Sequence, residues 1–388
     1  MSSQLAILVP SDDRKSAIRN PQLNVHMHIP DGYLSPATCA ALYAGAAPFW
    51  YIALRRVSRL LNTRLIPLLS LFAAFSFVVM MFNLPLPGGT TGHAVGVGVA
   101  AIVLGPWAAM LAISTALIIQ AFFFGDGGIT ALGANCFNLA IAGSLVAGGV
   151  YRMIGGRSPL NSARRVIAAA LGGYAAINIA ALLTAIEFGI QPMFYRDAAG
   201  TPLYAPYPLS IAIPAMMIGH LTFAGFAEAI VSGGVVAYLQ RSDPALLRLT
   251  APDARDFGVG EEQIEGWRAT RALWIGLAGL MILTPLGLLA TGAAWGEWGP
   301  EAFTDPEMRR QITQSSGKHS PPAWPPRELQ RLATIWTAPM PDYAPPFLRS
   351  DTFGYVMSAM TGTGLIILTF LVIGWMMKRR QEAGSTRR

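Results

Sequence analysis

The chain has 388 residues, of which 53% are hydrophobic and only 13% are charged, against about 25% charged in an average soluble domain. This composition excludes a water-soluble globule of this size. Long apolar runs without a short repeat exclude disordered and fibrous proteins. The net charge of +7 would suit a nucleic-acid partner, but the basic residues lie between the apolar runs, so membrane topology explains the charge and no nucleic-acid partner is expected. We predict an all-α, polytopic integral membrane protein.

Apolar stretches long enough to cross about 30 Å of hydrocarbon define the expected spans. There are nine in chain order: 34–54, 65–82, 93–104, 106–124, 133–150, 166–188, 210–239, 272–292 and 353–376. The third and fourth are separated only by Gly105-Pro106. They therefore form either a tight helical hairpin or one broken helix.

Basic residues follow the odd-numbered spans. Four clusters hold 18 of the 28 Lys and Arg residues: Arg55, Arg56, Arg59 and Arg64; Arg152, Arg157, Arg164 and Arg165; Arg241, Arg248, Arg255, Arg268 and Arg271; Lys378, Arg379, Arg380, Arg387 and Arg388. The loops 83–92 and 125–132 have none, and 189–209 has only Arg196. Because cytoplasmic loops carry the excess of positive charge, we expect an external N-terminus and a cytoplasmic C-terminus.

Span density and composition divide the chain into parts. Residues 1–26 form a polar extension, and residues 27–240, dense with spans, form a seven-span core. Residues 241–271 have the composition of a cytoplasmic linker. Residues 272–388 form a second unit of two spans around an external loop, 293–352, rich in Pro, Trp and polar residues. Such a small unit buries little surface by itself, so we expect it to pack on the core.

Ionisable residues at membrane depth are candidates for function because each costs a few kcal/mol to place there. Glu187, His220 and Glu228 lie inside expected spans, and His93 and Asp126 lie at span ends. His220 and Glu228 are about two helical turns apart, so they could share one face. A functional pair and a buried hydrogen-bonded pair or interface contact both remain open.

Two histidines are expected on the external side. His28 stands just before the first span, in the segment 27–32, and His93 stands at the start of the third, after the glycine-rich segment 88–92. Imidazole is a good ligand for Ni, Co, Cu and Zn. Brought together, the two side chains would make a metal site.

The site would be more specific if the mature chain began at Met27. A free α-amine on Met27 could chelate a metal together with the amide nitrogen and the imidazole of His28, and the fused rings would hold the three nitrogens in one plane. His93 would complete a square-planar set of four nitrogens, which favours Ni(II) or Cu(II) over tetrahedral Zn(II). Without a free amine, a Met-His pair is an ordinary loop segment.

Three segments in order resemble one family. Residues 27–36 (MHIPDGYLSP) are similar to the mature start of the cobalt- or nickel-specific substrate-capture components, CbiM/NikM, of energy-coupling factor transporters. Residues 92–107 (GHAVGVGVAAIVLGPW) resemble that family's second histidine and the helices after it. Residues 120–135 (QAFFFGDGGITALGAN) resemble its most distinctive loop. The C-terminal unit is more loosely similar to the small accessory subunit, CbiN/NikN, that is fused to some members.

The resemblance implies a seven-span protein of the bacterial inner membrane that binds Co(II) or Ni(II) through Met27, His28 and His93. Asn135 and Asn138, in or near the family loop, could support these ligands, although helix capping or packing is equally consistent. The chain has no G-x-x-x-x-G-K-[ST] motif, so we expect a transport component without its own ATPase, and not an enzyme. The resemblance supplies a transmembrane coupling (T) subunit and a pair of ATPase subunits as partners, with no permanently bound cofactor.

The chain departs from the family at its start, because 26 residues precede Met27. They contain no apolar core typical of a signal peptide. We expect that translation starts at Met27 and that residues 1–26 are absent from the mature protein. The alternative is a genuine extension, with His26 and His28 as replacement ligands beside His93.

Two other functions would make different demands on the sequence. A stand-alone secondary divalent-metal permease would need ionisable groups near the membrane midplane, where only His220 and Glu228 qualify. An intramembrane metallohydrolase would need an H-E-x-x-H helix, which the sequence lacks. Capture for an ATP-driven importer is therefore the preferred interpretation. The sequence does not decide between cobalt and nickel, since the same nitrogens bind both.

Overall fold

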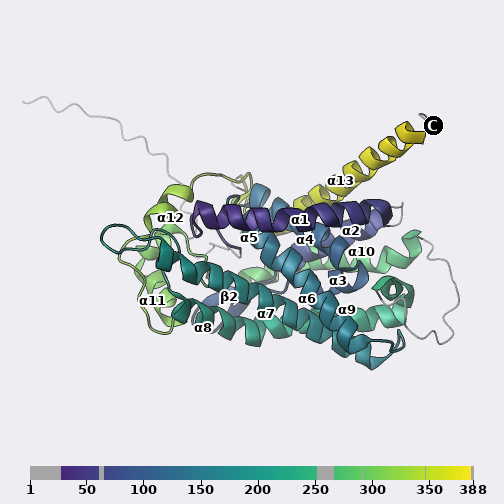
Figure 1. The fold of residues 1–388 in the computed structure, drawn as a ribbon, viewed down its shortest axis with the longest axis horizontal. Coiled ribbons are helices and arrows are strands. Elements are labelled where there is room, and N and C mark those ends of the chain that lie inside the picture. Colours follow the sequence, from purple (N-terminus) through teal and green to yellow (C-terminus); the bar gives the residue numbers. More distant parts are fainter. Residues whose placement is uncertain (1–27, 61–64, 251–265, 291, 346, 386–388) are drawn as a thin grey trace, which may run out of the picture.

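A computed structural model describes residues 28–60, 65–250, 266–290, 292–345 and 347–385. Long helices run side by side along the long axis of the molecule (Figure 1). Met27, His26 and the extension before them lie outside the described residues, so the predicted chain start has no structural counterpart here.

The expected membrane helices are confirmed in most places. In the described residues, seven helical segments are long and apolar enough to cross a membrane: Pro36–Ser58, Pro106–Phe124, Leu132–Gly155, Ala163–Phe194, Leu209–Ser242, Thr270–Leu289 and Asp351–Met376. They belong to the helices α1 (Pro36–Leu60), α4 (Pro106–Ile119), α5 (Leu132–Asn135), α6 (Gly143–Gly155), α7 (Ala163–Phe194), α8 (Leu209–Gly219), α9 (Gly225–Ser242), α10 (Gly266–Leu283) and α13 (Asp351–Ser385). A shorter apolar helix, α2 (Leu65–Met80), matches the second expected span.

Three of these long segments contain π-helical turns. The π-helices are η2 (Gln120–Phe124) after α4, η3 (Cys136–Ala142) between α5 and α6, and η4 (His220–Ala224) between α8 and α9. A π-turn inserts one residue into an α-helix, and such turns are frequent at functional sites.

The third expected span, 93–104, is wrong as a full-length helix. Only α3 (Val97–Val103) forms there, and seven residues rise about 10 Å, a third of the hydrocarbon thickness. Gly96, at the N-terminal cap of α3, has φ 72°, a left-handed conformation that helical residues do not adopt. The chain before α3 is therefore non-helical, and every residue of α3 is buried by the surrounding helices.

A small hairpin replaces the simple loop expected between the second and third spans. Strands β1 (Leu84–Leu86) and β2 (Thr90–Gly92) pair antiparallel. Thr91 of β2 also donates from its backbone N to Ala293 O (3.3 Å) and from Oγ1 to Gly292 O (3.2 Å). The hairpin therefore joins the core to the C-terminal unit directly before His93.

The basic segments gather at one end of the molecule. Arg56, near the end of α1, lies over the ring of Trp107 at the start of α4, 4.5 Å from its centroid. Thr250, in the 3-10 helix η5 (Pro244–Thr250) that follows α9, bonds to Ile102 O at the end of α3. Gln240 at the end of α9 donates to two carbonyls of the α6–α7 connection. The ends of α1, α3, α6 and α9 thus lie together.

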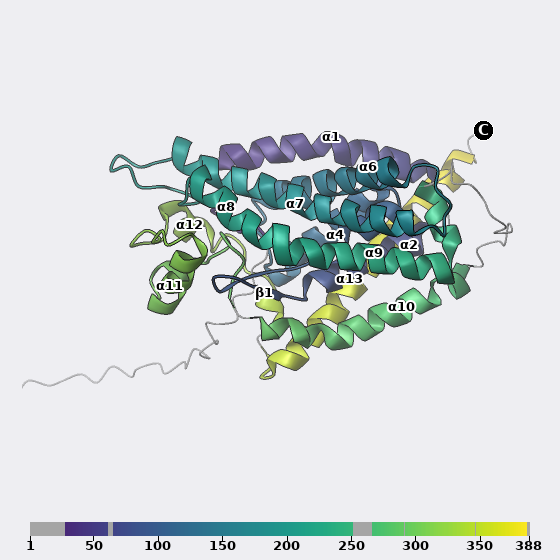
Figure 2. The ribbon, with the colours of Figure 1, turned by 90° about the horizontal axis from the view of Figure 1, so that it is seen from below.

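The C-terminal unit packs on the core, as expected. Helices α10 and α13 both pack against α2, and Tyr355, Ala359 and Ile366 of α13 belong to the same buried cluster as Phe77 of α2. Between α10 and α13 lie η6 (Thr284–Leu289), η7 (Pro300–Phe303), α11 (Pro306–Ser315), α12 (Arg327–Leu332) and η8 (Pro341–Tyr343). Helices α11 and α12 gather at the end opposite the C-terminus (Figure 2).

Candidate metal centre

The two predicted histidines meet. His28 and His93 are 2% and 7% exposed, and their ring centroids are 5.5 Å apart with the planes inclined at 60°. Two imidazoles bound side by side on one ion, with metal–nitrogen bonds of about 2.0–2.1 Å, would have centroids roughly 4.5 Å apart. The observed separation is therefore about 1 Å longer than that of two imidazoles on one ion.

The segment after His28 is held by the loop that follows η2 and by helix α5. Ile29 N donates to Asn135 Oδ1 (3.0 Å), and Asn135 Nδ2 donates back to Ile29 O (3.2 Å). Asp31 Oδ1 accepts from the backbone N of Thr130 (2.7 Å). Gly128 N donates to Ile29 O (2.8 Å), and a Cβ on Gly128 would lie 2.3 Å from Asp31 N, so only glycine allows this approach. The backbone beside His28 is thereby fixed.

His93 is positioned by a buried carboxylate from α9. Glu228 Oε2 accepts from Val95 N (2.7 Å) and Gly96 N (2.8 Å), and Oε1 accepts from Gly98 N (3.1 Å). Ser232 Oγ donates to the same Oε1 (3.3 Å). These amides precede and open α3, where helix geometry leaves N–H groups without intrahelical partners and favours negative charge. Glu228 therefore anchors the non-helical segment that begins at His93.

The hydrogen bonds of the two rings assign their nitrogens. His93 Nδ1 lies 2.9 Å from Ala94 O, and because a carbonyl only accepts, Nδ1 carries the proton and Nε2 keeps the lone pair. His28 Nδ1 lies 3.0 Å from Asp126 Oδ1, which also accepts. His28 Nε2 is buried with no hydrogen-bond partner in the described part of the chain.

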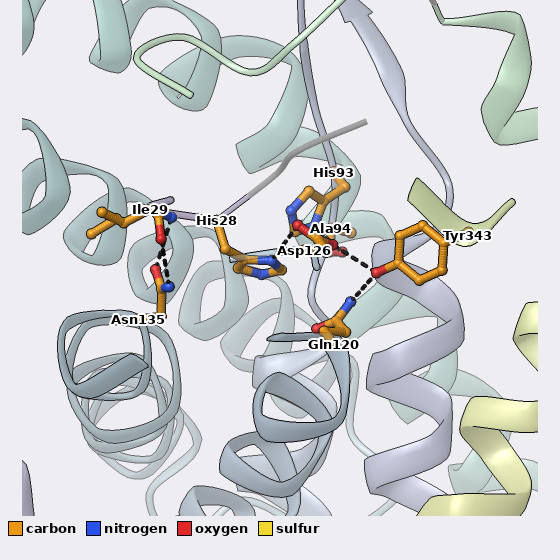
Figure 3. A network of polar contacts seen from close by, with 8 residues as sticks. All are labelled: His28, Ile29, His93, Ala94, Gln120, Asp126, Asn135 and Tyr343. Carbon is orange, nitrogen blue, oxygen red and sulfur yellow. Dashed lines mark hydrogen bonds and ion pairs between the residues drawn. The ribbon is translucent and has the colours of Figure 1, made fainter. Parts of the chain in front are cut away.

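A polar network extends from His28 into the C-terminal unit (Figure 3). Tyr343 OH donates to Asp126 Oδ2 (2.6 Å), and Gln120 Nε2 donates to Tyr343 OH (2.9 Å). Burial and the negative charge of Asp126 raise the pKa of Tyr343 well above its ordinary value, so its hydroxyl stays a donor. The C-terminal unit therefore positions Asp126 through Tyr343, and Asp126 in turn positions His28.

The histidines open on a cavity of about 50 Å³, enough for one ion with few waters. Its lining includes His28, His93, Asn135, Asn138, His220 and Glu297. Five of these six residues come from the core, and Glu297 comes from the C-terminal unit. Burial and the charge of Asp126 raise the pKa of Glu297 well above its ordinary value.

The other predicted residues have separate roles. Asn138 Nδ2 donates to Glu187 Oε2 (2.9 Å) and to Thr184 Oγ1 (3.1 Å), so Asn138 links η3 to α7 at the wall of the cavity. His220 and Glu228 do not pair: His220 Nδ1 bonds Met216 O, while Glu228 binds the start of α3. The π-turn between them changes the helical phase, so a spacing of eight residues no longer gives one face.

Within the described ranges, no three side chains of His, Cys, Asp or Glu converge as a ligand set. The predicted chelate uses only two side chains, and its other two nitrogens are main-chain groups of residues 27 and 28. Met27 lies outside the described residues, so the amine is not placed.

Sequence reasoning missed two of the residues at the site. Tyr343 and Glu297 come from the C-terminal unit, more than 150 residues from the core motifs. A charged residue in the apolar run Trp295-Gly296-Glu297-Trp298 was the available signal for Glu297. For Tyr343 there was no signal, because nothing in the sequence indicates which residue of the unit reaches Asp126.

Comparisons with known proteins assign the two parts. The chain matches the cobalt uptake substrate-specific transmembrane region, CbiM, over residues 28–246, and the PDGLE domain over residues 269–379. The resemblance found in the sequence motifs is thereby confirmed.

Relatives cover nearly the whole chain. A fused nickel transport protein, NikMN, of Rhodobacter capsulatus is 56% identical over 88% of this chain and 95% of its own. A probable fused nickel transport protein, LarMN, of Lactiplantibacillus plantarum is 39% identical over 88% of this chain and 96% of its own. A crystal structure of a transition metal transporter, 48% identical, superimposes with a TM-score of 0.53 over 58% of this chain and 99% of that one.

Proposed function

Since the chain belongs to the CbiM family of cobalt uptake substrate-specific transmembrane proteins, we propose that it captures Ni(II) or Co(II) for an ATP-driven importer of the energy-coupling factor type. It is a multi-pass membrane protein whose relatives are transport proteins. The ion is cargo, held at the cavity between His28 and His93 before it crosses.

The observation that carries the proposal is the pairing of His28 and His93 at 5.5 Å on one buried cavity, although 64 residues separate them in the chain. In the proposed chelate, the Met27 amine, the His28 amide nitrogen and the His28 imidazole bind the ion in one plane, and His93 Nε2 fills the fourth position. His93 Nδ1 donates to Ala94 O, which orients Nε2 as the ligand.

Capture requires one exchange at His28. Only Nδ1 can close a six-membered chelate ring with the backbone nitrogen of the same residue, and Nδ1 here contacts Asp126 Oδ1 at 3.0 Å. The metal therefore replaces both Asp126 and the proton on Nδ1, and the ring stays neutral by carrying its proton on Nε2 instead. The Asp126 carboxylate is left beside the positive charge of the complex, and the Tyr343 hydroxyl still holds it in place.

Nickel is the proposed cargo. Two relatives that match along 88% of the chain are named as nickel transport proteins, whereas a cobalt transport protein, CbiM, of Geobacter sulfurreducens is 34% identical over 67% of the chain. A planar set of four nitrogens also suits Ni(II) well.

The proposed orientation places the metal cavity outside and the basic end of the helices in the cytoplasm. A transmembrane coupling subunit and a pair of ATPase subunits are the proposed partners. Ala37, Ala41 and Ala44 are exposed on α1, and such small side chains allow close approach of a partner helix. Uptake that proceeds without ATPase subunits would instead identify a secondary permease.

The experiment compares Ni(II) affinity, by titration calorimetry, for the chain starting at Met27 and the same chain preceded by residues 1–26. Loss of a residue that only hydrogen-bonds to a metal ligand typically weakens metal binding by about 10–100-fold. Blocking the amine removes a ligand itself, so it should weaken binding by more than that. His93→Ala should do the same, while His319→Ala, at an exposed position, is the control. Intact mass of the protein made from its own gene reports which start is used.

Equal affinities for the two chain starts would refute the role of the amine. They would leave His26, His28 and His93 as an imidazole site. Tighter binding of Co(II) than of Ni(II) by the Met27 form would refute the nickel assignment.

A further inference from the structure

Glu297 is a buried carboxylate that the C-terminal unit inserts into the metal cavity. It is 5% exposed and lies between Trp295 and Trp298, each 4% exposed. The Tyr33 hydroxyl, just before α1, donates to Trp298 O (3.0 Å) and accepts from Trp298 N (3.2 Å). These contacts fix the segment that carries Glu297 against the core.

The surroundings of Glu297 do not account for its burial. Its Oε2 has no hydrogen-bond partner within the part of the chain that the structure describes. The nearby charge of Asp126 acts against a second negative charge at this place. A buried, unpaired carboxylate is costly unless a cation or donors compensate it. The cavity that Glu297 shares with His28 and His93 would admit such a cation.

We propose that Glu297 is an oxygen contact for the divalent cation on its way into the chelate, supplied by the C-terminal unit. The inference rests on the proposed function and extends it to the step of loading. A carboxylate oxygen replaces a water of the hydrated ion, and the nitrogens of residues 27, 28 and 93 then displace the carboxylate.

The geometry favours a contact in transit over a permanent ligand. No three acidic, His or Cys side chains converge on one point among the described residues, so Glu297 does not share a ligand set with both histidines. A planar set of four nitrogens also has no in-plane position left for an oxygen. A contact of this kind speeds both binding and release, and changes their ratio little.

The test measures Ni(II) binding and release by stopped-flow, using quenching of tryptophan fluorescence in the full chain starting at Met27. Trp295 and Trp298 adjoin the cavity residue and serve as reporters. Glu297→Gln keeps the side-chain volume but cannot ionise to a carboxylate when the cation arrives. We expect association and dissociation each to slow about tenfold, with Kd changed by less than about threefold. Glu297→Asp, which keeps a carboxylate, should recover part of both rates.

The matched control is Glu301→Gln, four residues later at an exposed position, which should leave both rates unchanged. Melting temperatures of all variants show that the rates compare folded proteins. Wild-type rates in Glu297→Gln would overturn the inference, and so would a Kd weakened through faster release alone. A His93→Ala variant that binds as the wild type does would instead overturn the proposed function, so the two failures are distinguishable.

Discussion

Replacement of Glu228 by Gln should loosen His93 without touching any proposed metal ligand. Glu228 is completely buried and gives both carboxylate oxygens to the backbone before and at the start of α3. Gln has nearly the same shape but offers one acceptor oxygen. If that oxygen accepts from Val95 N and Gly96 N, the new NH2 group of Gln faces the N–H of Gly98. Two hydrogen-bond donors then oppose each other.

The hydrogen bonds give the size of the effect. Leaving the buried Gly98 N–H without an acceptor costs about 1–3 kcal/mol. The bonds from Val95 and Gly96 change from charge-assisted to neutral, which loses about 1 kcal/mol each. Glu228→Gln should therefore destabilise the start of α3 by about 3–5 kcal/mol. Because His93 stands two residues before Val95, Ni(II) affinity should fall by at least about tenfold.

Glu187→Gln is the matched control, since it replaces another buried carboxylate on the neighbouring helix α7. Among the hydrogen bonds of the described residues, its carboxylate accepts from Asn138 Nδ2, and the oxygen of Gln can keep that bond. Thermal melting in detergent and titration calorimetry with Ni(II) measure stability and affinity for both variants. If Glu228→Gln melts and binds Ni(II) as Glu187→Gln does, the assigned role of Glu228 is refuted.

Three further predictions concern the network, the chelate and the topology. Tyr343→Phe removes a donor to Asp126 and an acceptor for Gln120, so it should lower stability by about 1–3 kcal/mol in thermal melts; an unchanged melting temperature would contradict the network. Ligand nitrogens bind metal only unprotonated, so Ni(II) affinity should fall as pH falls, and calorimetry in buffers of different ionisation enthalpy should detect released protons; binding without proton release would exclude an amide ligand. A reporter fused after Arg388 should be cytoplasmic and one inserted near Pro322 external, and the reverse result would overturn the proposed orientation.

The sequence predicts the long helices well because each is an apolar run of membrane length. It fails at 93–104 because hydropathy reports burial and not conformation. Residues 97–103 are all buried, but the chain before them is a hairpin and a left-handed Gly96. This non-helical segment depends on Glu228, 132 residues from Gly96, whose carboxylate accepts hydrogen bonds from its buried backbone N–H groups.

The sequence predicts the two histidines of the candidate site but not the residues that the C-terminal unit contributes. His28 and His93 stand beside spans, so topology alone places both on one side of the membrane. The C-terminal unit reaches the same cavity with Glu297, and reaches Asp126 with Tyr343, through residues 293–352, which have no periodic pattern. Which of its residues point inward depends on the docking of Trp298 against Tyr33, a contact between residues 265 positions apart.

The π-turns limit how this protein can vary in length. The turns begin at Gln120, Cys136 and His220, and they include Gln120, Asn138 and His220, which all lie at the metal cavity or its hydrogen-bond network. Deleting one residue from η3 or η4 would restore an ordinary α-helix there and rotate the helix that follows, α6 or α9, by about 100°. Substitutions on the lipid-facing surface of these helices should therefore be tolerated in evolution, whereas single-residue insertions and deletions should not.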